Sequence, residues 1–484
     1  MPKVLICNTY FYRFDQKQWS NQMPYPPLGT IYAASYLANQ GFEVQFFDNN
    51  LVHDANAIAS TLEEFNPDYF VIYDDGFNYL TKMCLTVMRE ACFTMLSLTK
   101  DKPIKTLVSS SDSTDHYEMY LNNGADIVLL GEAEESLIES LNLLETDASL
   151  NNCKGIAFQD ADDQLQVNPR RPVLRDLDSL PPPNWDLIDV AAYKSIWANS
   201  KEEFSLNIAT TRGCPYKCNW CAKPIYGNRY NAHSPEYIVS IIEKLYHQFG
   251  VQRFWMCDDI FGLKPGWVQK FGELLNERNL KITYYIQSRV DLLLKEDTID
   301  VLANSGLEEV WLGAESGSQE ILDAMDKGTQ IEDIYKATQL LKKRGVRVAF
   351  FLQFGYLGET KEHIKKTINM LKYLLPDNIG ISVSYPLPGT KFYDKVKEDL
   401  KLKANWKDSD DLDMMFTGTY ESAYYKKLQR YVHKVFRKYQ GIDQLKKAFL
   451  KPTNINSGQL MSITKLLYYI PSSYYDQLTT FNDL

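Results

Sequence analysis

Cysteine is scarce in this chain and mostly scattered. Only eight cysteines occur in 484 residues, which excludes the disulfide framework of a small secreted protein. The N-terminus has no basic segment followed by a long apolar core, so it does not resemble a secretory signal. We therefore expect a reduced protein of the cytoplasm.

Positive charge and long apolar runs are also lacking. The formal net charge is −10, and no basic run exceeds a few residues, which disfavours charge-driven binding to nucleic acid. No stretch approaches about 18 uninterrupted apolar residues, so we expect no transmembrane span. The length suggests about two to four domains. The hydrophobic content of 45% allows a large buried core.

Three cysteines, Cys214, Cys218 and Cys221, stand in one eight-residue window with the spacing C-x3-C-x2-C. Thiolates are soft ligands that suit iron–sulfur clusters, zinc or copper(I). A closed zinc site needs four ligands, so a zinc site here would also require Cys257 or His233. Three thiolates on a [4Fe–4S] cube instead leave one iron open for a small ligand. Purely structural cysteines are the remaining alternative.

The local sequence around these cysteines is Arg-Gly-Cys-Pro-Tyr-Lys-Cys-Asn-Trp-Cys. It resembles the cluster motif of the radical S-adenosylmethionine (SAM) enzymes. The resemblance implies that the open iron binds the amino and carboxylate groups of SAM. It also implies that an electron from a donor such as flavodoxin or ferredoxin cleaves SAM to methionine and a 5′-deoxyadenosyl radical.

Residues 206–400 repeat a strand followed by a helix six times, which fits a partial (β/α)6 barrel with its active site at the carboxyl ends of the strands. The expected strands are Leu206–Thr210, Arg253–Cys257, Lys281–Gln287, Glu308–Leu312, Arg347–Phe354 and Ile379–Ser384. Ser234 followed by Pro235 predicts a helix start. Thr329 with Glu332 predicts a capping box for another helix.

Polar residues follow several of these strands, where the resemblance places the SAM site. Asp258 and Asp259 take the place of the family's motif for the amino group, although helix capping is an alternative for adjacent aspartates. A guanidinium such as that of Arg289 suits the SAM carboxylate. The residues expected to position SAM are Asp258, Asp259, Gln287, Arg289, Glu315 and Ser316. The sequence singles out no catalytic acid or base.

Residues 1–145 alternate five short apolar runs with helical patterns, which indicates a Rossmann-like doubly wound parallel sheet. The expected strands are Lys3–Cys7, Glu43–Phe47, Tyr69–Tyr73, Lys105–Ser109 and Asp126–Leu130. Such sheets bind ligands at the carboxyl ends of their strands.

Pro26-Pro27-Leu28-Gly29 and Gly131-Glu132-Ala133-Glu134 resemble parts of the cobalamin-binding domain that precedes the cluster in one class of radical SAM enzymes. The resemblance implies a cobalamin site that includes Pro27, Leu28, Gly29, Ser110, Gly131 and Glu132. The family's Gly-Gly-x-His turn after the fourth strand reads Ser109-Ser110-Ser111-Asp112 here. Glycine lets a backbone approach a bulky ligand, so a domain that has lost its cofactor is the alternative.

The remaining segments are a linker and a C-terminal region. Residues 146–205 are polar and are expected to be an irregular linker, stiffened by Pro181–Pro183. Residues 401–484 are expected to be mainly helical and resemble the tail of the class that includes the anaerobic Mg-protoporphyrin monomethyl ester cyclase. An apolar helix face there predicts core or a substrate lid, with contact to a membrane surface as the alternative. Its residues are Leu460, Ile463, Leu466, Leu467 and Ile470.

Taken together, the resemblance implies a cobalamin-dependent radical SAM methyltransferase that acts on an unactivated carbon of a small-molecule or peptide substrate. Oxidative cyclisation or another rearrangement with the same cofactors is one alternative. A radical SAM enzyme whose first domain no longer binds cobalamin is a second. A non-enzymatic iron–sulfur or zinc protein is the alternative from another class.

Overall fold

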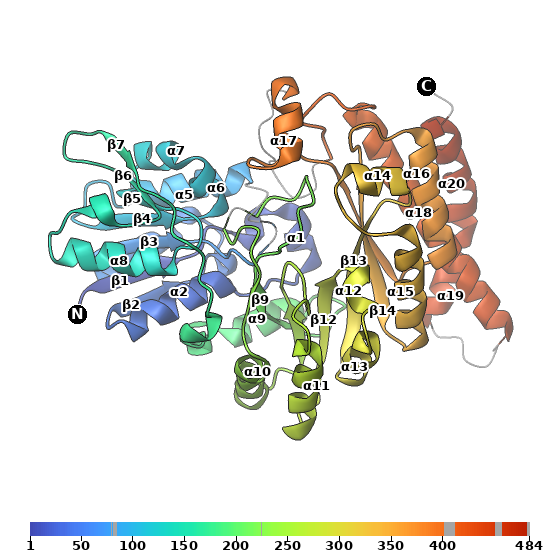
Figure 1. The fold of residues 1–484 in the computed structure, drawn as a ribbon, viewed down its shortest axis with the longest axis horizontal. Helices are drawn as coiled ribbons and strands as arrows, with labels where there is room; N and C mark the ends of the chain where they lie inside the picture. Colours follow the sequence, from blue (N-terminus) through green and yellow to red (C-terminus); the bar gives the residue numbers. More distant parts are fainter. Residues whose placement is uncertain (79, 81–84, 224, 401–411, 451–456, 482–484) are drawn as a thin grey trace. The chain divides into compact units, whose positions relative to one another are not determined.

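The computed structural model describes residues 1–78, 80, 85–223, 225–400, 412–450 and 457–481 (Figure 1). The chain divides into two compact units. The first contains Met1–Tyr216 and Ala222–Gln287, and the second contains Lys217–Cys221 together with residues 288–400 and 412–481. In the described part of the chain, no helix is long and apolar enough to cross a membrane.

The first unit is built on a seven-stranded sheet with the strand order β2-β1-β3-β4-β5-β6-β7. The five predicted parallel strands are present: β1 Lys3–Cys7, β2 Glu43–Phe47, β3 Tyr69–Tyr73, β4 Lys105–Ser109 and β5 Ile127–Leu129. The chain runs from β1 to β2 on one side and then returns to β3 on the other side of β1. The topological switch point therefore lies between β1 and β3, where such sheets bind ligands.

Helices and short irregular turns connect these strands. The helices of this part are α1 Gln16–Asn21, α2 Leu28–Asn39, α3 Ala59–Phe65, α5 Thr86–Ser97, α6 Ser111–Asp115, α7 Tyr117–Asn122 and α8 Glu134–Glu145. One face of the sheet packs into a buried apolar cluster that contains Val4, Ile6, Val71, Leu107 and Leu129. The periodic apolar runs of the sequence therefore form this core.

The expectation of an irregular segment between residues 146 and 205 is corrected by the structure. β6 Ile156–Gln159 and β7 Leu165–Val167 extend the first sheet as antiparallel strands, and α9 Val190–Trp197 follows them. Strands this short carry too few residues to show an alternating pattern, and pairing with β5 stabilises them.

A second sheet holds six strands in the order β15-β14-β13-β12-β11-β8. Its strands are β8 Leu206–Ile208, β11 Arg253–Met256, β12 Thr283–Ser288, β13 Leu307–Glu315, β14 Arg347–Phe354 and β15 Asn378–Val383, and β9 Thr211–Arg212 pairs separately with β10 Asn231–Ala232. The helices are α10 Pro235–Phe249, α11 Trp267–Glu277, α12 Val290–Leu293, α13 Thr298–Asn304, α14 Gln319–Ala324, α15 Ile331–Lys343, α16 Lys361–Leu374 and α17 Lys391–Val396. The alternation of strand and helix confirms the predicted α/β architecture.

Two predicted helix starts have different outcomes. α10 begins as expected, because the Ser234 hydroxyl accepts a hydrogen bond from the Tyr237 N–H and Pro235 occupies the first helical position. The capping box predicted from Thr329 is wrong, because α15 begins at Ile331. The Ile331 N–H donates instead to the side chain of Gln319, 3.0 Å away on α14. A tertiary contact therefore caps this helix.

Three helices form the C-terminal region: α18 Ser422–Leu450, α19 Ser457–Thr464 and α20 Leu466–Phe481. α20 packs on α18, as Figure 1 shows. The prediction that Leu460, Leu467 and Ile470 belong to a core is wrong, since they are 57%, 86% and 52% exposed. Of the predicted face, Leu466 is buried, because the side of α20 that carries it faces the neighbouring helices.

Candidate active site

The three clustered cysteines lie on the loop that follows β8 and β9. Cys214, Cys218 and Cys221 are partly exposed and none is in a disulfide. Within the described ranges, no three His, Cys, Asp or Glu side chains are placed to hold a single metal ion. A [4Fe–4S] cube takes each thiolate on a different iron, so its ligands stand farther apart than those of one ion. The all-thiol donor set therefore fits an iron–sulfur cluster.

His233, the possible fourth zinc ligand, has other partners. Its Nδ1 lies 2.9 Å from Asp178, and its ring stacks on Tyr237 with the centroids 4.2 Å apart. Burial lowers the pKa of this imidazole. These contacts give the histidine a structural role in the first unit.

Asn219, between the second and third cysteines, anchors the loop within the second unit. Its N–H donates to the Met325 carbonyl at 3.0 Å, and its side-chain amide donates to the Ala324 carbonyl at 2.7 Å. The Tyr356 hydroxyl donates to its side-chain oxygen at 2.8 Å. Its carbonyl accepts from the Phe392 N–H at 2.9 Å. Two backbone and two side-chain contacts of a residue only 3% exposed hold this part of the loop in place.

Asp258, expected at the SAM amino group, holds the turn that begins the cluster loop. Its carboxylate accepts hydrogen bonds from the Thr210 N–H, the Thr210 hydroxyl and the Thr211 N–H, each at 2.7 Å. Burial raises the pKa of Asp258 to about 7. The neighbouring Asp259 is exposed, and Gln287 is half-buried at the end of β12. Contact of these residues with SAM stays a prediction.

Glu315 and Lys327 form a buried ion pair at the carboxyl end of β13. The Lys327 ammonium lies 2.8 Å from the Glu315 carboxylate, and the two side chains are 8% and 6% exposed. The strand pairing shifts register between Gly313 and Glu315, and Glu315 has a φ of +54°. A bulge with a left-handed non-glycine residue is a feature that re-aims a side chain at functional sites.

Lys327 also lies in the electrostatic field of Cys218. Burial lowers the pKa of Lys327, but Glu315 and then the Cys218 thiolate raise it, and the result is above its ordinary value. Sequence reasoning missed this lysine. The signal available was a cation twelve residues after Glu315, in Met325-Asp326-Lys327-Gly328.

Arg289, the predicted partner of the SAM carboxylate, is engaged with the protein. Its guanidinium donates to Asp291 at 2.9 Å and to the carbonyls of Lys327 and Gly328 at 2.8 and 3.3 Å. It therefore supports the turn that presents Lys327. The buried Ser316 hydroxyl lies 3.2 Å from the Thr367 hydroxyl of α16, which fixes the segment after β13.

Two aromatic rings and a buried amide lie on one face of β13 and β14. Trp311 and Phe351 lie with their ring centroids 4.6 Å apart. Both cover Gly380, where an added Cβ would lie 3.2 Å from Trp311 and 3.4 Å from Phe351. Gln353, two residues beyond Phe351 on the same face, is 1% exposed. In the described structure neither of its side-chain polar atoms has a hydrogen-bond partner.

The radical SAM superfamily profile matches residues 208–371 of this chain. Residues 208–371 form a radical SAM domain. The superfamily implies a [4Fe–4S] cluster and SAM, in agreement with the three thiolates of the loop.

Relatives of this radical SAM protein include proteins named as methyltransferases and proteins named as cyclases. It is 25% identical to an uncharacterized methyltransferase of Pyrococcus horikoshii, over 80% of this chain and 82% of that protein. It is 26% identical to the anaerobic magnesium-protoporphyrin IX monomethyl ester cyclase of Rubrivivax gelatinosus, over 78% of this chain and 67% of that protein.

Solved structures share the fold over most of the chain. OxsB, a cobalamin-dependent SAM radical enzyme with aqua-cobalamin and SAM bound, matches with a TM-score of 0.73 and 17% identity, covering 99% of this chain and 72% of that one. TsrM from Kitasatospora setae, with cobalamin and a [4Fe–4S] cluster, matches with a TM-score of 0.66 and 18% identity, covering 82% and 75%. These matches confirm the predicted fold class.

In the first domain of this radical SAM protein, the edge of the sheet at the carboxyl ends of its parallel strands is polar. The Thr9 hydroxyl donates to Asp74 at 2.6 Å. Asp112 accepts two hydrogen bonds from the Arg89 guanidinium at 2.5 Å and one from the Tyr120 hydroxyl at 2.7 Å. The cavity here is about 20 Å³, so the edge could present a surface to a large ligand but does not enclose one.

The residues predicted for cobalamin are placed around this edge. Gly29 packs so closely on the end of β3 that an added Cβ would lie 3.1 Å from the Gly76 nitrogen. Ser110 caps α6, and the Gly131 N–H donates to the Thr114 hydroxyl at 3.2 Å. The buried Ser111 hydroxyl lacks a partner among the described residues. Hydroxyl, carboxylate and guanidinium groups suit the amides and phosphate at the periphery of cobalamin, so the residue types fit.

Glu132 has a further role that the sequence did not indicate. It lies 2.6 Å from Arg212, and Glu134 lies 2.7 Å from the same guanidinium. Burial lowers the pKa of Arg212, but Glu134 and Glu132 more than offset this and hold it above its ordinary value. Because Arg212 precedes Gly213-Cys214, the Gly-Glu-Ala-Glu turn is tied directly to the start of the cluster loop.

Proposed function

We propose that this protein is a radical SAM enzyme that removes a hydrogen atom from an unactivated carbon of its substrate and methylates that carbon with the help of cobalamin. The observation that carries the proposal is the three-cysteine loop at the carboxyl end of the first barrel strand, held within the second unit by Asn219. Cys214, Cys218 and Cys221 would hold the cluster.

When bound, the cluster supplies the electron that cleaves SAM to methionine and a 5′-deoxyadenosyl radical. The chain contributes position and charge. Lys327 places a buried cation beside Glu315 and within the electrostatic field of Cys218, where an anionic group of SAM would be stabilised. The aromatic rings of Trp311 and Phe351 exclude water from a reactive radical. A one-electron donor such as flavodoxin or ferredoxin completes the reaction.

Cobalamin, when bound, supplies the methyl group. Support comes from the likeness of the whole fold to OxsB and TsrM, both with cobalamin. A hopanoid C-3 methylase of Methylococcus capsulatus, 23% identical over 75% of this chain, is a further relative named for methylation. The residues that would face the cofactor lie at the polar edge of the first sheet, including Ser110, Ser111 and Gly131. The substrate is proposed to be a small molecule or a peptide.

A radical SAM enzyme without cobalamin is the second candidate, and one observation favours it. The turn after β4 carries Asp112 in place of the expected histidine, and Asp112 is tied to Arg89 and Tyr120. Counting corrinoid after reconstitution separates the two candidates.

The test is anaerobic reconstitution with iron, sulfide and hydroxocobalamin, followed by desalting and quantitation. We expect a [4Fe–4S] spectrum, formation of 5′-deoxyadenosine from SAM on reduction, and retained corrinoid. The variant with all three cysteines changed to alanine should lose the iron and the SAM cleavage. Wild-type protein that holds the cluster and does not cleave SAM would contradict the radical SAM proposal. Absence of retained corrinoid would contradict the cobalamin part alone.

Transfer of label from methyl-labelled SAM to a product tests methylation directly. A product that forms without label, while 5′-deoxyadenosine accumulates, would favour cyclisation or another rearrangement.

A further inference from the structure

The C-terminal hairpin, defined as residues 422–450 and 457–481, differs in charge from the rest of the chain. It contains nine Lys and Arg residues and two Asp residues. This is a surplus of seven positive charges in a protein whose formal net charge is −10. Lys446 and Lys447 are exposed in the last turns of α18, and Lys465 is exposed between α19 and α20. Such an asymmetry indicates a surface for an anionic partner.

Large apolar side chains are exposed along the same hairpin. Ten apolar or aromatic residues between positions 449 and 478 are each at least 40% exposed, whereas the rest of the described chain has four such residues. The most prominent are Phe449, Leu450, Leu460, Met461, Leu467 and Ile470. Exposed apolar groups at this density mark an interaction surface.

The exposed residues of the hairpin follow the periodicity of its helices. On α20, Leu466, Ser473 and Thr480 are buried at seven-residue spacing. Leu467 and Tyr474 lie one residue further on and are 86% and 64% exposed. The outer face of α20 is therefore continuous and uncovered among the described residues.

Apolar and basic side chains share one face at the end of α18. Phe449 and Leu450 are 80% and 82% exposed and stand three and four residues after Lys446, which places them on its face. Lysines beside protruding apolar side chains are typical of helices that lie in a membrane interface, where the apolar groups enter and the ammonium groups meet the headgroups.

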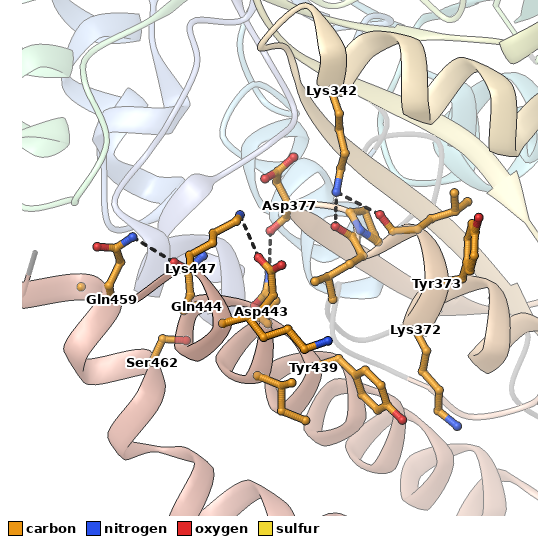
Figure 2. Close-up of a pocket in the computed structure, with 17 residues that line it drawn as sticks. Lys342, Lys372, Tyr373, Asp377, Tyr439, Asp443, Gln444, Lys447, Gln459 and Ser462 are labelled. Carbon is orange, nitrogen blue, oxygen red and sulfur yellow. Dashed lines mark hydrogen bonds and ion pairs between the residues drawn. The ribbon is translucent and has the colours of Figure 1, made fainter. Parts of the chain in front are cut away.

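A cavity of about 710 Å³ lies beside these residues, between the hairpin and the ends of α15 and α16 (Figure 2). Lys342, Lys372, Lys446 and Lys447 line it together with Asp377 and Asp443. The Lys342 ammonium donates to the Leu374 carbonyl at 2.9 Å, and Lys447 lies 2.8 Å from Asp443. Burial lowers the pKa of both Lys342 and Lys372. Cations outnumber anions in this cavity.

We propose that the C-terminal hairpin docks this protein on a membrane surface with anionic headgroups, with its exposed apolar side chains in the interface and the lysine-lined cavity against the lipid phosphates. The positive charge of the hairpin favours an anionic membrane over a second copy of this chain. Two copies of the hairpin would each carry the same positive surplus and would repel one another, which disfavours a dimer through this surface. The proposal is independent of the reaction at the barrel.

The test uses the full chain and co-sedimentation with two kinds of vesicle. One is phosphatidylcholine alone, and the other is phosphatidylcholine with about one-third phosphatidylglycerol. Each Lys or Arg near an anionic surface contributes about 1 kcal/mol, so we expect partition onto the anionic vesicles to be at least about tenfold stronger. Added salt should weaken it, because screening shortens the reach of the charges.

Two pairs of variants locate the surface. Phe449→Asp with Leu450→Asp should lower the partition at least about tenfold, whereas Leu165→Asp with Val167→Asp, at exposed positions of β7, should leave it unchanged. Lys446→Glu with Lys447→Glu should also lower the partition onto the anionic vesicles at least about tenfold. Its matched control is Lys395→Glu with Lys397→Glu, at exposed positions of the segment around α17.

Equal binding to both kinds of vesicle, with no effect of salt, would overturn the proposal. So would binding of neither kind, or a dimer in light scattering that Phe449→Asp with Leu450→Asp dissociates. Stabilisation of the protein by inorganic phosphate without binding to vesicles would also overturn it.

Discussion

The ammonium of Lys327 lies 2.8 Å from the carboxylate of Glu315, and both side chains are buried at the carboxyl end of β13. The pair sits over Gly313, where an added Cβ would lie 2.6 Å from the Lys327 nitrogen. Glycine at this position is therefore what leaves room for the pair. Arg289 holds the turn that carries Lys327. Arg289 therefore has a structural role, whereas Lys327 lies in the candidate site.

Lys327→Met should strongly destabilise the protein, by about 3–5 kcal/mol, because it leaves the Glu315 carboxylate buried without a partner. Adding Glu315→Gln to that variant should recover a large part of the loss, since the uncompensated charge is then gone. Chemical denaturation of the two single variants and the double variant measures this coupling. Additive losses would show that the two residues do not stabilise one another. SAM affinity should fall in all three variants.

Asn219→Ala should reduce the iron retained after reconstitution, because the loop between Cys218 and Cys221 loses its side-chain contacts to Ala324 and Tyr356. The loss of stability should be about 1–3 kcal/mol, the cost of leaving buried polar groups without partners. Iron quantitation and the rate of cluster loss to a chelator measure the effect. Asn199→Ala, at an exposed position, is the control. Equal iron content in both variants would contradict the anchoring role.

Glu359 should make stability fall with rising pH. Burial raises its pKa to about 8 from an ordinary value of 4.5. The folded protein therefore binds the proton more tightly than the unfolded chain. The stabilisation is complete below about pH 4.5 and is lost progressively as the pH rises to about 8.

Glu359→Gln should remove this part of the pH dependence and be more stable than wild type above about pH 8, because glutamine resembles the protonated acid. Denaturation between pH 5 and 9 tests it, with Glu362→Gln at an exposed neighbouring position as the control. An unchanged slope in Glu359→Gln would show that this carboxyl does not titrate as expected.

Gln353→Leu should leave the ligand-free protein as stable as wild type or more stable, by about 1–3 kcal/mol, because a buried amide without partners is costly. Leu352→Ala, on the opposite face of β14, should cost about 2–5 kcal/mol as an ordinary core truncation. Thermal and chemical unfolding of both variants compare the two faces of the strand. A strongly destabilised Gln353→Leu would mean that the amide serves packing and not a ligand.

Much of this fold was predictable because its signals are local. Buried parallel strands correspond to short apolar runs in the sequence. For this reason β1 to β4 and β14 have the predicted bounds or lie within them. The start of α10 depends on Ser234 and Pro235 alone, and it was predicted for that reason. β6 and β7 were not, because their stability comes from pairing with β5.

The candidate site divides in the same way. The spacing of Cys214, Cys218 and Cys221 indicates cluster ligation, because a cluster needs several thiolates on one short loop. Arg289 was predicted to bind the SAM carboxylate, and its contacts with Lys327 and Gly328 were not predicted, because they come from a distant turn.

By itself the sequence determined the main parallel strands, the cysteine motif, the kinship to radical SAM enzymes and the basic character of the C-terminal hairpin, all of which depend on composition and short-range spacing. Only the tertiary structure decided which cation pairs with Glu315, which side chain caps α15, and that most of the large apolar residues of α19 and α20 are exposed. Those features arise from contacts between residues far apart in the chain, and the local spacing of residues does not predict such contacts.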